Sequence, residues 1–284
     1  MFDVILENAR GDQLKFGTGT PFSIVEIQGL NPTPATINVS EMALVDGVRF
    51  NSSKLQGKTL NVAFAIEYEA AKNRIEVYKV LKTKQWVRFY FKNQYRDVYI
   101  DGYVETVDIS FFEMKQIVTV AIICPSPYFT ARQTSYIEGV TISDTFTFPF
   151  SSTATPQLTF GEVSANAVAN IENDGDVSCG MIITIDCIND ISLPKIINTA
   201  TGDFIMVQVQ MITGDTLVID TRRGKKTAMM THEGVTTNVF QNIVEGSTWL
   251  LLEPKNNVFT YEVAMGTESD IVVSFEFNAL YEGV

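Results

Sequence analysis

The stretch IENDGDVSCGMIITIDCINDISLPKIINTATGDFIMVQVQMITGDTLVIDTRRGKK, residues 171–226, predicts a β-meander. Its turns are built from Asn, Asp and Gly, which adopt a positive φ at little cost. After the first turn, alternate apolar residues share one face, as a half-buried strand requires; they are Cys179, Met181, Ile183, Ile185 and Cys187. A similar strand is predicted at 204–211, followed by turns at 213–215 and 222–225. Because no residue here has an obvious chemical role, we interpret the stretch as architectural.

The composition is that of a folded protein, with 45% hydrophobic and 19% charged residues in a chain of 284. This length allows one large domain or two of ordinary size. The first ten residues lack the features of a signal peptide, and no apolar run approaches the ~20 residues of a membrane-spanning helix. We expect a soluble protein. Cys124, Cys179 and Cys187 are odd in number and are predicted to be small core residues rather than a disulfide or a metal site.

The net charge of −12 is divided unevenly along the chain. Residues 1–130 carry 14 basic and 14 acidic side chains, so the whole acidic excess lies in residues 131–284. An acidic second part repels nucleic acid and anionic membranes. The division also favours two domains. We predict a first domain at 1–135, a linker at 136–156 and a second domain at 157–284.

The first half predicts strands with one helix among them. Apolar alternation indicates strands at 60–66, 85–91, 96–110 and 116–124, which end at two prolines, Pro125 and Pro127. Asp46-Gly47 predicts a hairpin turn, preceded by a flexible stretch. Residues 68–82 instead repeat apolar positions at three and four, which predicts a helix with a buried face; that face comprises Ala71, Ile75, Tyr78 and Leu81.

The second half closes with more strands, predicted at 248–254, 256–265 and 271–281. Short alternating strands separated by turns are typical of a β-sandwich. The fold class expected for the chain is therefore mainly β, with one helix in the first half. The aromatic side chains of Trp249, Phe259, Tyr261, Phe275 and Phe277 could form a sugar-stacking face. Their period-two spacing favours the core.

A search for reactive groups yields no catalytic, cofactor-binding or metal-binding residue. His232 is the only histidine, no HExxH or GxSxG motif is present, and no glycine-rich nucleotide motif occurs. Nothing selects a pair of carboxylates for glycoside hydrolysis, and Asp174 with Asp176 lacks the rest of a calcium loop. We interpret His232 as an ordinary loop residue and the protein as not an enzyme.

The remaining candidates are partner contacts. The only dense basic cluster is a predicted turn, which is either simply solvated or contacts an acidic partner surface; it contains Arg222, Arg223, Lys225 and Lys226. Arg49 and Asn51 are further candidates.

In this order and spacing, the turn motifs resemble the C-terminal, galectin-like half of siphovirus distal tail proteins. They are 173–176, 194–198, 201–203, 214–221 and 224–226. The first half resembles the ring-forming half of the same family at 86–91, Arg96, Tyr99, 102–105 and 124–129. The chain departs from the family pattern at Lys58-Thr59, where an arginine is expected, and at Lys255-Asn256 in a turn that usually contains glycine.

The resemblance implies a structural role in a phage or prophage tail, made in the cytoplasm of the bacterial host. Six copies would form a ring around a DNA-conducting channel, joining the tail tube protein to the tail-associated hub protein and anchoring receptor-binding proteins. No sequence-specific nucleic-acid binding, membrane or cofactor is implied. Two alternatives are a carbohydrate-binding β-sandwich module and, less well supported, a glycosidase.

Overall fold

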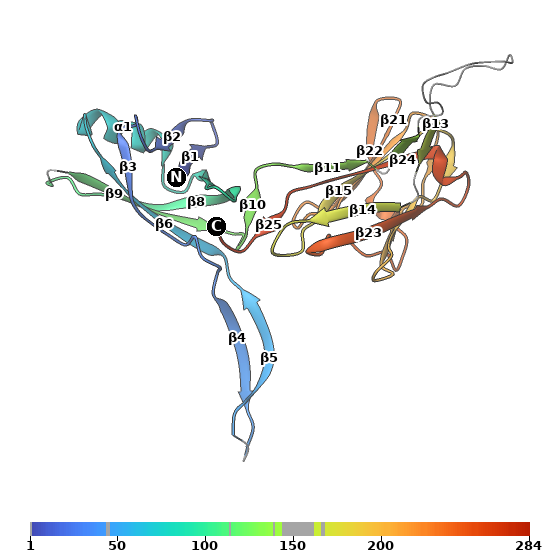
Figure 1. Ribbon diagram of the computed structural model, residues 1–284, viewed down its shortest axis with the longest axis horizontal. Coiled ribbons are helices and arrows are strands. Elements are labelled where there is room, and N and C mark those ends of the chain that lie inside the picture. Colours follow the sequence, from blue (N-terminus) through green and yellow to red (C-terminus); the bar gives the residue numbers. More distant parts are fainter. Residues whose placement is uncertain (1, 44–45, 114, 139, 144–161, 166–167) are drawn as a thin grey trace, which may run out of the picture. The chain divides into compact units, whose positions relative to one another are not determined.

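The structure is a computed structural model that describes residues 2–43, 46–113, 115–138, 140–143, 162–165 and 168–284. The chain divides into two compact units (Figure 1). Unit 1 comprises Met1–Gln133 and Leu280–Val284, and unit 2 comprises Thr134–Ala279. Strands dominate both units, and unit 1 contains the one α-helix of the described residues, so the expected fold class is confirmed.

Unit 1 is built on an antiparallel sheet with the strand order β2-β1-β7-β8-β9-β6-β3, to which β10 and β25 are added. The strands are β1 (Asp3–Asn8), β2 (Gln13–Phe16), β3 (Phe22–Gln28), β6 (Lys58–Ile66), β7 (Trp86–Lys92), β8 (Asp97–Ile109), β9 (Gln116–Cys124), β10 (Phe129–Ala131) and β25 (Leu280–Tyr281). The predicted alternation is confirmed in β6, whose Leu60, Val62 and Phe64 are buried. Phe16, Phe22 and Phe64 meet edge-on or tilted in the core.

The helix α1 (Ala70–Val80) lies where the sequence predicts it, but it buries a different face. Asn73, Val77 and Val80 are buried, whereas Ile75 and Tyr78 are 55% and 42% exposed. Only Leu81 of the predicted face is buried together with them. Asn73 can face inward because its side-chain amide donates to the carbonyl oxygen of Tyr68 at 2.6 Å. Packing against the sheet therefore decided the buried face, and the apolar pattern did not.

Two strands of unit 1 stand apart from its main sheet. β4 (Ala35–Glu41) and β5 (Val48–Leu55) pair with each other and form a separate two-stranded sheet (Figure 1). We call this ribbon the arm. The hairpin turn predicted at Asp46-Gly47 lies between its strands, but residues 35–41, predicted to be flexible, are instead a paired strand. Among the described residues no helix is long and apolar enough to cross a membrane.

Unit 2 contains two larger antiparallel sheets and two small ones. The six-stranded sheet has the order β11-β24-β15-β20-β21-β22 and the four-stranded sheet the order β14-β23-β17-β18. Their strands are β11 (Ser135–Glu138), β14 (Val168–Asn173), β15 (Met181–Cys187), β17 (Lys195–Asn198), β18 (Phe204–Met206), β20 (Thr216–Asp220), β21 (Thr227–His232), β22 (Val235–Asn238), β23 (Lys255–Glu262) and β24 (Ile271–Phe277). The small sheets pair β12 (Val140–Ser143) with β13 (Glu162–Ala165) and β16 (Ile191–Ser192) with β19 (Gln210–Met211).

The two larger sheets of unit 2 share a core. Phe259 of β23 and Phe275 of β24 have ring centroids 5.7 Å apart, and both side chains are fully buried. Tyr261 and Phe277 are buried as well, so the core interpretation of these four aromatic residues is confirmed. For Trp249 the core interpretation is wrong, because this side chain is only half-buried.

Three predicted strands of the second half differ from the structure. The strand predicted at 271–281 is divided into β24 and β25, and β25 belongs to the sheet of unit 1. The strand expected at 204–211 is interrupted between β18 and β19, where Val207 bridges to Ile243 and Val209 accepts the amide of Leu193. Residues 248–254 form no named strand and contribute only the bridge between Leu252 and Cys179. β11 and β12 lie in the range predicted as linker, and residues 144–156 of that range lie outside the described part of the chain. The boundaries 1–135 and 157–284 stay predictions.

Candidate interaction site

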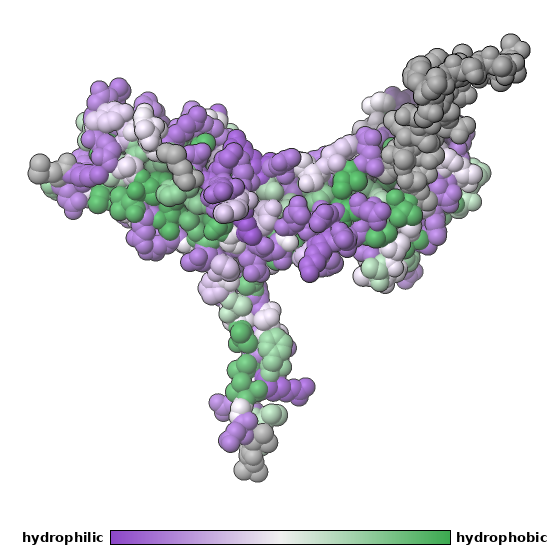
Figure 2. All heavy atoms as spheres, in the orientation of Figure 1, coloured by the Kyte–Doolittle hydropathy of each residue, from purple (hydrophilic) through white to green (hydrophobic). Residues whose placement is uncertain are grey.

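The arm has an apolar face that is open to solvent. Ile37, Val39, Val48 and Phe50 are 60%, 49%, 56% and 61% exposed. The register pairs Val39 with Phe50 and Glu41 with Val48, which puts these side chains on the same side of the ribbon. In Figure 2 green hydrophobic side chains run along the arm.

The opposite face of the arm is polar. The Asn38 amide donates to the Ser52 hydroxyl at 2.9 Å, and the Ser40 hydroxyl donates to Asn51 Oδ1 at 3.3 Å. Arg49 is paired with Ser40 on this face and is exposed. The arm is therefore an amphipathic ribbon. A two-stranded ribbon is marginally stable in water when nothing covers its apolar face, so the arm has the properties of a segment that docks on a partner.

The root of the arm consists of residues 29–34 and 56–58, which connect it to β3 and β6. Gly29 has a φ of 95°, and a Cβ at this position would lie 2.3 Å from the carbonyl oxygen of Thr59. A Cβ on Gly57 would lie 2.8 Å from the carbonyl oxygen of Cys124. Both connections therefore pass so close to neighbouring backbone that only glycine fits.

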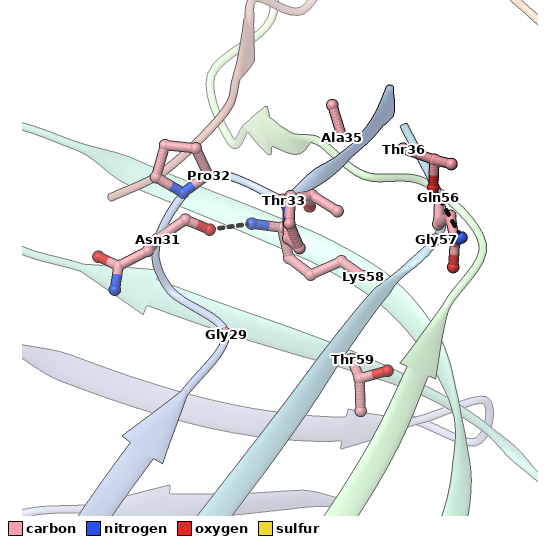
Figure 3. A pocket seen from close by; sticks show the side chains of 11 residues that line it. Gly29, Asn31, Pro32, Thr33, Ala35, Thr36, Gln56, Gly57, Lys58 and Thr59 are labelled. Carbon is pink, nitrogen blue, oxygen red and sulfur yellow. Dashed lines mark hydrogen bonds between the residues drawn. The ribbon is translucent and has the colours of Figure 1, made fainter. Parts of the chain in front are cut away.

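Lys58, the last residue of the root and the first of β6, is buried, with 3% of its surface exposed. Its ammonium donates to the carbonyl oxygens of Asn31, at 2.6 Å (Figure 3), and Glu282, at 3.0 Å. It also lies 4.7 Å from the centroid of the Phe129 ring. Burial lowers the pKa of Lys58, while the charges of Cys124 and Glu282 act in the opposite direction.

A hollow of about 400 Å³ lies between the two chain segments of the root. Figure 3 shows the residues that line it. The Gln56 side-chain amide spans one side and donates to the Thr36 hydroxyl at 3.0 Å. The lining is largely threonine, proline and glycine, with Lys58 as its charged residue. Such a set offers polar surface but no acid–base pair, and in the described part of the chain no cluster of His, Cys, Asp or Glu could hold a metal.

Residues 280–284 contact the root from another part of the sequence. β25 pairs with β10, with Tyr281 opposite Phe129. The Val284 amide donates to the carbonyl oxygen of Leu30 at 3.2 Å. The Arg96 guanidinium donates to the Gly283 carbonyl oxygen and lies 4.3 Å from the centroid of the Tyr281 ring.

The predicted contact residues fall into two places. Arg49 and Asn51 lie on the polar face of the arm in unit 1, whereas the basic cluster lies in the turn between β20 and β21 of unit 2. Within that cluster Arg222 is held by Asp220, with Nη2 and Oδ2 2.7 Å apart. Arg223, Lys225 and Lys226 are exposed. Their role in partner contact stays a prediction.

Lys226 belongs to a small cluster of side chains on unit 2. Its Nζ lies 5.2 Å from the centroid of the Trp249 ring, and the Trp249 and Phe240 rings have centroids 5.6 Å apart. Phe240 is 46% exposed. A partly exposed aromatic pair beside a cation can stack on a sugar or on a planar group.

His232 ends the strand β21 rather than lying in a loop. Its Nδ1 is 2.8 Å from Oδ1 of the buried Asp215, and hydrogen bonding and the charge of this carboxylate raise the pKa of His232. The other Asp215 oxygen accepts the amide of Ile212 at 2.9 Å. The pair connects the end of β21 to the turn before β20, so its effect is structural.

The three cysteines are buried and unpaired, which confirms that they are core residues. Desolvation raises the pKa of both Cys124 and Cys179 to about 12. Thiols that remain protonated near neutral pH are poor nucleophiles and metal ligands.

The apolar face of the arm was missed by the sequence-based predictions. The signal was present in ATINVSE and VRFNSSKL, where Ile37 and Val39, and Val48 and Phe50, alternate with polar residues. Alternation of this kind predicts an amphipathic ribbon on both sides of the Asp46-Gly47 turn.

The described residues form a mainly β protein of two units, whose arm exposes an apolar face. Residues 174–279 match the family described as the siphovirus-type tail component, C-terminal domain. The resemblance to siphovirus distal tail proteins that was predicted from the sequence is thereby confirmed. No curated protein sequence matches the chain.

Among solved structures, the chain has the fold of SPP1 Dit, described as a paradigm of hub adsorption apparatus in phages that infect Gram-positive bacteria. The TM-score is 0.69 at 14% identity, over 98% of this chain and 99% of that one. Chains of the phage P2 baseplate in its activated conformation, with Ca and with Sr, match with a TM-score of 0.52 at 11% identity over the whole of both chains. These structures show the fold of the chain, and the family match supports a structural role in a phage tail.

Proposed function

We propose that the protein is the distal hub of a siphophage tail, in which six copies close head to tail into a ring. The observation that carries the proposal is the exposed apolar face of the arm, with Phe50 61% exposed at its centre. Within the described part of the chain nothing covers this face, because its apolar side chains are exposed and β4 and β5 pair only with each other. Burial of such a face needs another chain.

A second copy of the same chain is the partner that the ring requires. In a head-to-tail ring, each copy contributes two different surfaces, and the rotation between neighbours decides whether the ring closes. The arm supplies one of these surfaces, because a ribbon can reach over a neighbour while its main sheet remains in place. In each interface, a neighbouring copy covers the four apolar side chains of one arm, and their removal from water stabilises the ring.

The ring encloses a channel through which DNA passes without being read. Residues 1–130 are electrically balanced, which suits a lumen that must not retain a polyanion. One side of the ring joins the tail tube protein and the other the tail-associated hub protein. Unit 2, a galectin-like sandwich, anchors receptor-binding proteins. The role is non-enzymatic, the place of action is the virion tail, and synthesis takes place in the host cytoplasm.

A carbohydrate-binding module is the second candidate, favoured by the exposed Phe240 and the adjacent half-buried Trp249 beside Lys226. This function predicts that the monomer binds glycans and that Trp249→Ala abolishes the binding. A glycosidase has no comparable support from the described residues.

The ring is tested by light scattering and negative-stain imaging of the purified chain, alone and with the tail tube protein. We expect a species of about 190 kDa, six times the 31.6 kDa chain, with a central hole. Phe50→Asp places a charge on the apolar face and should abolish this species. The matched control Ser52→Asp, on the polar face, should retain it. A chain that stays monomeric beside the tube protein, or a ring unaffected by Phe50→Asp, contradicts the proposal.

A further inference from the structure

The five residues 280–284 follow unit 2 in the sequence but belong to unit 1. They form the short strand β25 on β10, and they end against the segment that leads from β3 into the arm. Gly283 lies so close to this segment that a Cβ on it would be 3.1 Å from both the Leu30 carbonyl oxygen and Pro32 Cδ.

Two hydrogen bonds join residues 280–284 to the root of the arm, and a third joins the two segments of the root to each other. The Val284 amide bonds to the Leu30 carbonyl oxygen, and the Lys58 ammonium bonds to Glu282 and Asn31 at the same time. Lys58 begins β6, and only Gln56 and Gly57 separate it from the end of β5. A single buried side chain therefore holds both ends of the arm and residues 280–284 together.

Lys58 is unusual for a fold stabiliser. Burying a charged group is unfavourable unless it is well bonded, and the two bonds of Lys58 go to backbone carbonyl oxygens. An apolar side chain of the same length would fill the space at less cost to the fold. What the ammonium adds is a fixed geometry between three backbone segments.

We propose that residues 280–284 are a strap that fixes the direction of the arm, with Lys58 as its fastening. The arm leaves the sheet through two narrow glycine connections above an open hollow, so its own strands do not define its angle. The strap supplies the missing restraint. Its importance for assembly rests on the proposed ring, whereas its effect on the direction of the arm does not.

The direct test measures the distance between the arm and the main sheet in the full chain. Spin labels are attached at Ser52→Cys on the polar face of the arm and Lys15→Cys on β2, both exposed positions. The native cysteines are buried and should not react. Pulsed electron paramagnetic resonance, with labelled chain diluted in unlabelled chain, gives the distribution of this distance.

The Lys58→Met variant keeps the length of the side chain and removes both hydrogen bonds. We expect the width of the distance distribution to increase at least twofold and the concentration for half-assembly to rise at least tenfold. The matched control Lys54→Met changes an exposed lysine of the arm itself and should leave both values unchanged. A folded Lys58→Met chain with the original width overturns the strap.

A second variant decides the matter if Lys58→Met fails to fold. Gly283→Val leaves Lys58 intact and places a side chain against Leu30 and Pro32, so it should shift and widen the distribution by a smaller amount. An unchanged distribution in a folded Gly283→Val chain overturns the strap as well. Failure of the proposed ring is recognised separately, because Phe50→Asp would then leave the assembled mass unchanged. The width of the distance distribution tests the strap in either case.

Discussion

The arm and the main sheet of unit 1 contain the same kind of strand in opposite surroundings. In β6 the alternate residues Leu60, Val62 and Phe64 are completely buried, whereas in the arm Val39 and Phe50 are about half exposed or more. Both regions alternate apolar and polar residues at period two. The period therefore identifies an amphipathic strand, and the surroundings decide whether its apolar face becomes a core or an interface.

Substituting a phenylalanine in each region should separate these roles most strongly. Phe64→Ala removes a fully buried ring and should lower the free energy of unfolding by about 3–5 kcal/mol. Phe50→Ala should change the stability of the monomer by only about 0.5 kcal/mol but weaken assembly. Urea denaturation of dilute chain, combined with light scattering, measures both effects. Equal losses of monomer stability would show that the arm is packed within its own chain.

A glycine pair sharpens the comparison at the place where the arm meets the sheet. Gly29 and Gly11 have similar φ values of 95° and 85°, but only Gly29 lies against backbone, while Gly11 has nothing within 4 Å. Gly11→Ala should cost about 1 kcal/mol through its backbone conformation. Gly29→Ala should cost about 3 kcal/mol because the root must also move. Thermal unfolding of both variants measures the difference. Equal decreases in melting temperature would contradict the close approach of Gly29 to the backbone of Thr59.

In the helix α1, too, the surroundings and not the apolar pattern decide which residues are buried. Asn73→Ala should destabilise unit 1 by about 1–2 kcal/mol, because it removes the hydrogen bond from a buried amide to the carbonyl oxygen of Tyr68. Ile75→Ser, at the exposed position that the apolar pattern assigned to the core, should change stability by no more than about 0.5 kcal/mol. A larger loss of stability in Ile75→Ser than in Asn73→Ala, measured by urea denaturation, would show that the face predicted from the sequence is the buried one.

These cases explain how far the sequence predicts the structure. Strand positions in the main sheet, the turn at Asp46-Gly47 and the buried aromatics of β23 and β24 follow from local spacing, because turn chemistry and alternation are local properties. The buried face of α1 does not, because Asn73 is accepted inside through a bond to the Tyr68 backbone. The strap is equally inaccessible, since Lys58 and Glu282 are joined across 224 positions of sequence. No local pattern in a single sequence encodes such a contact.

The smallest expected effect concerns unit 2, where His232 contacts Asp215 at the surface. The pKa of His232 is raised, chiefly by its hydrogen bond to Asp215. A raised pKa means that the stabilisation is fully present below the ordinary value of about 6.5 and is lost as pH rises through the folded-state pKa. The melting temperature of unit 2 should therefore fall slightly over this interval in the natural chain. His232→Gln should remove that fall and leave the remaining pH dependence in place. Because His232 is about half exposed, solvent screens the pair and the change should be small but of fixed sign. A melting temperature that instead rises over this interval by more in the natural chain than in His232→Gln would show that Asp215 does not hold the imidazolium.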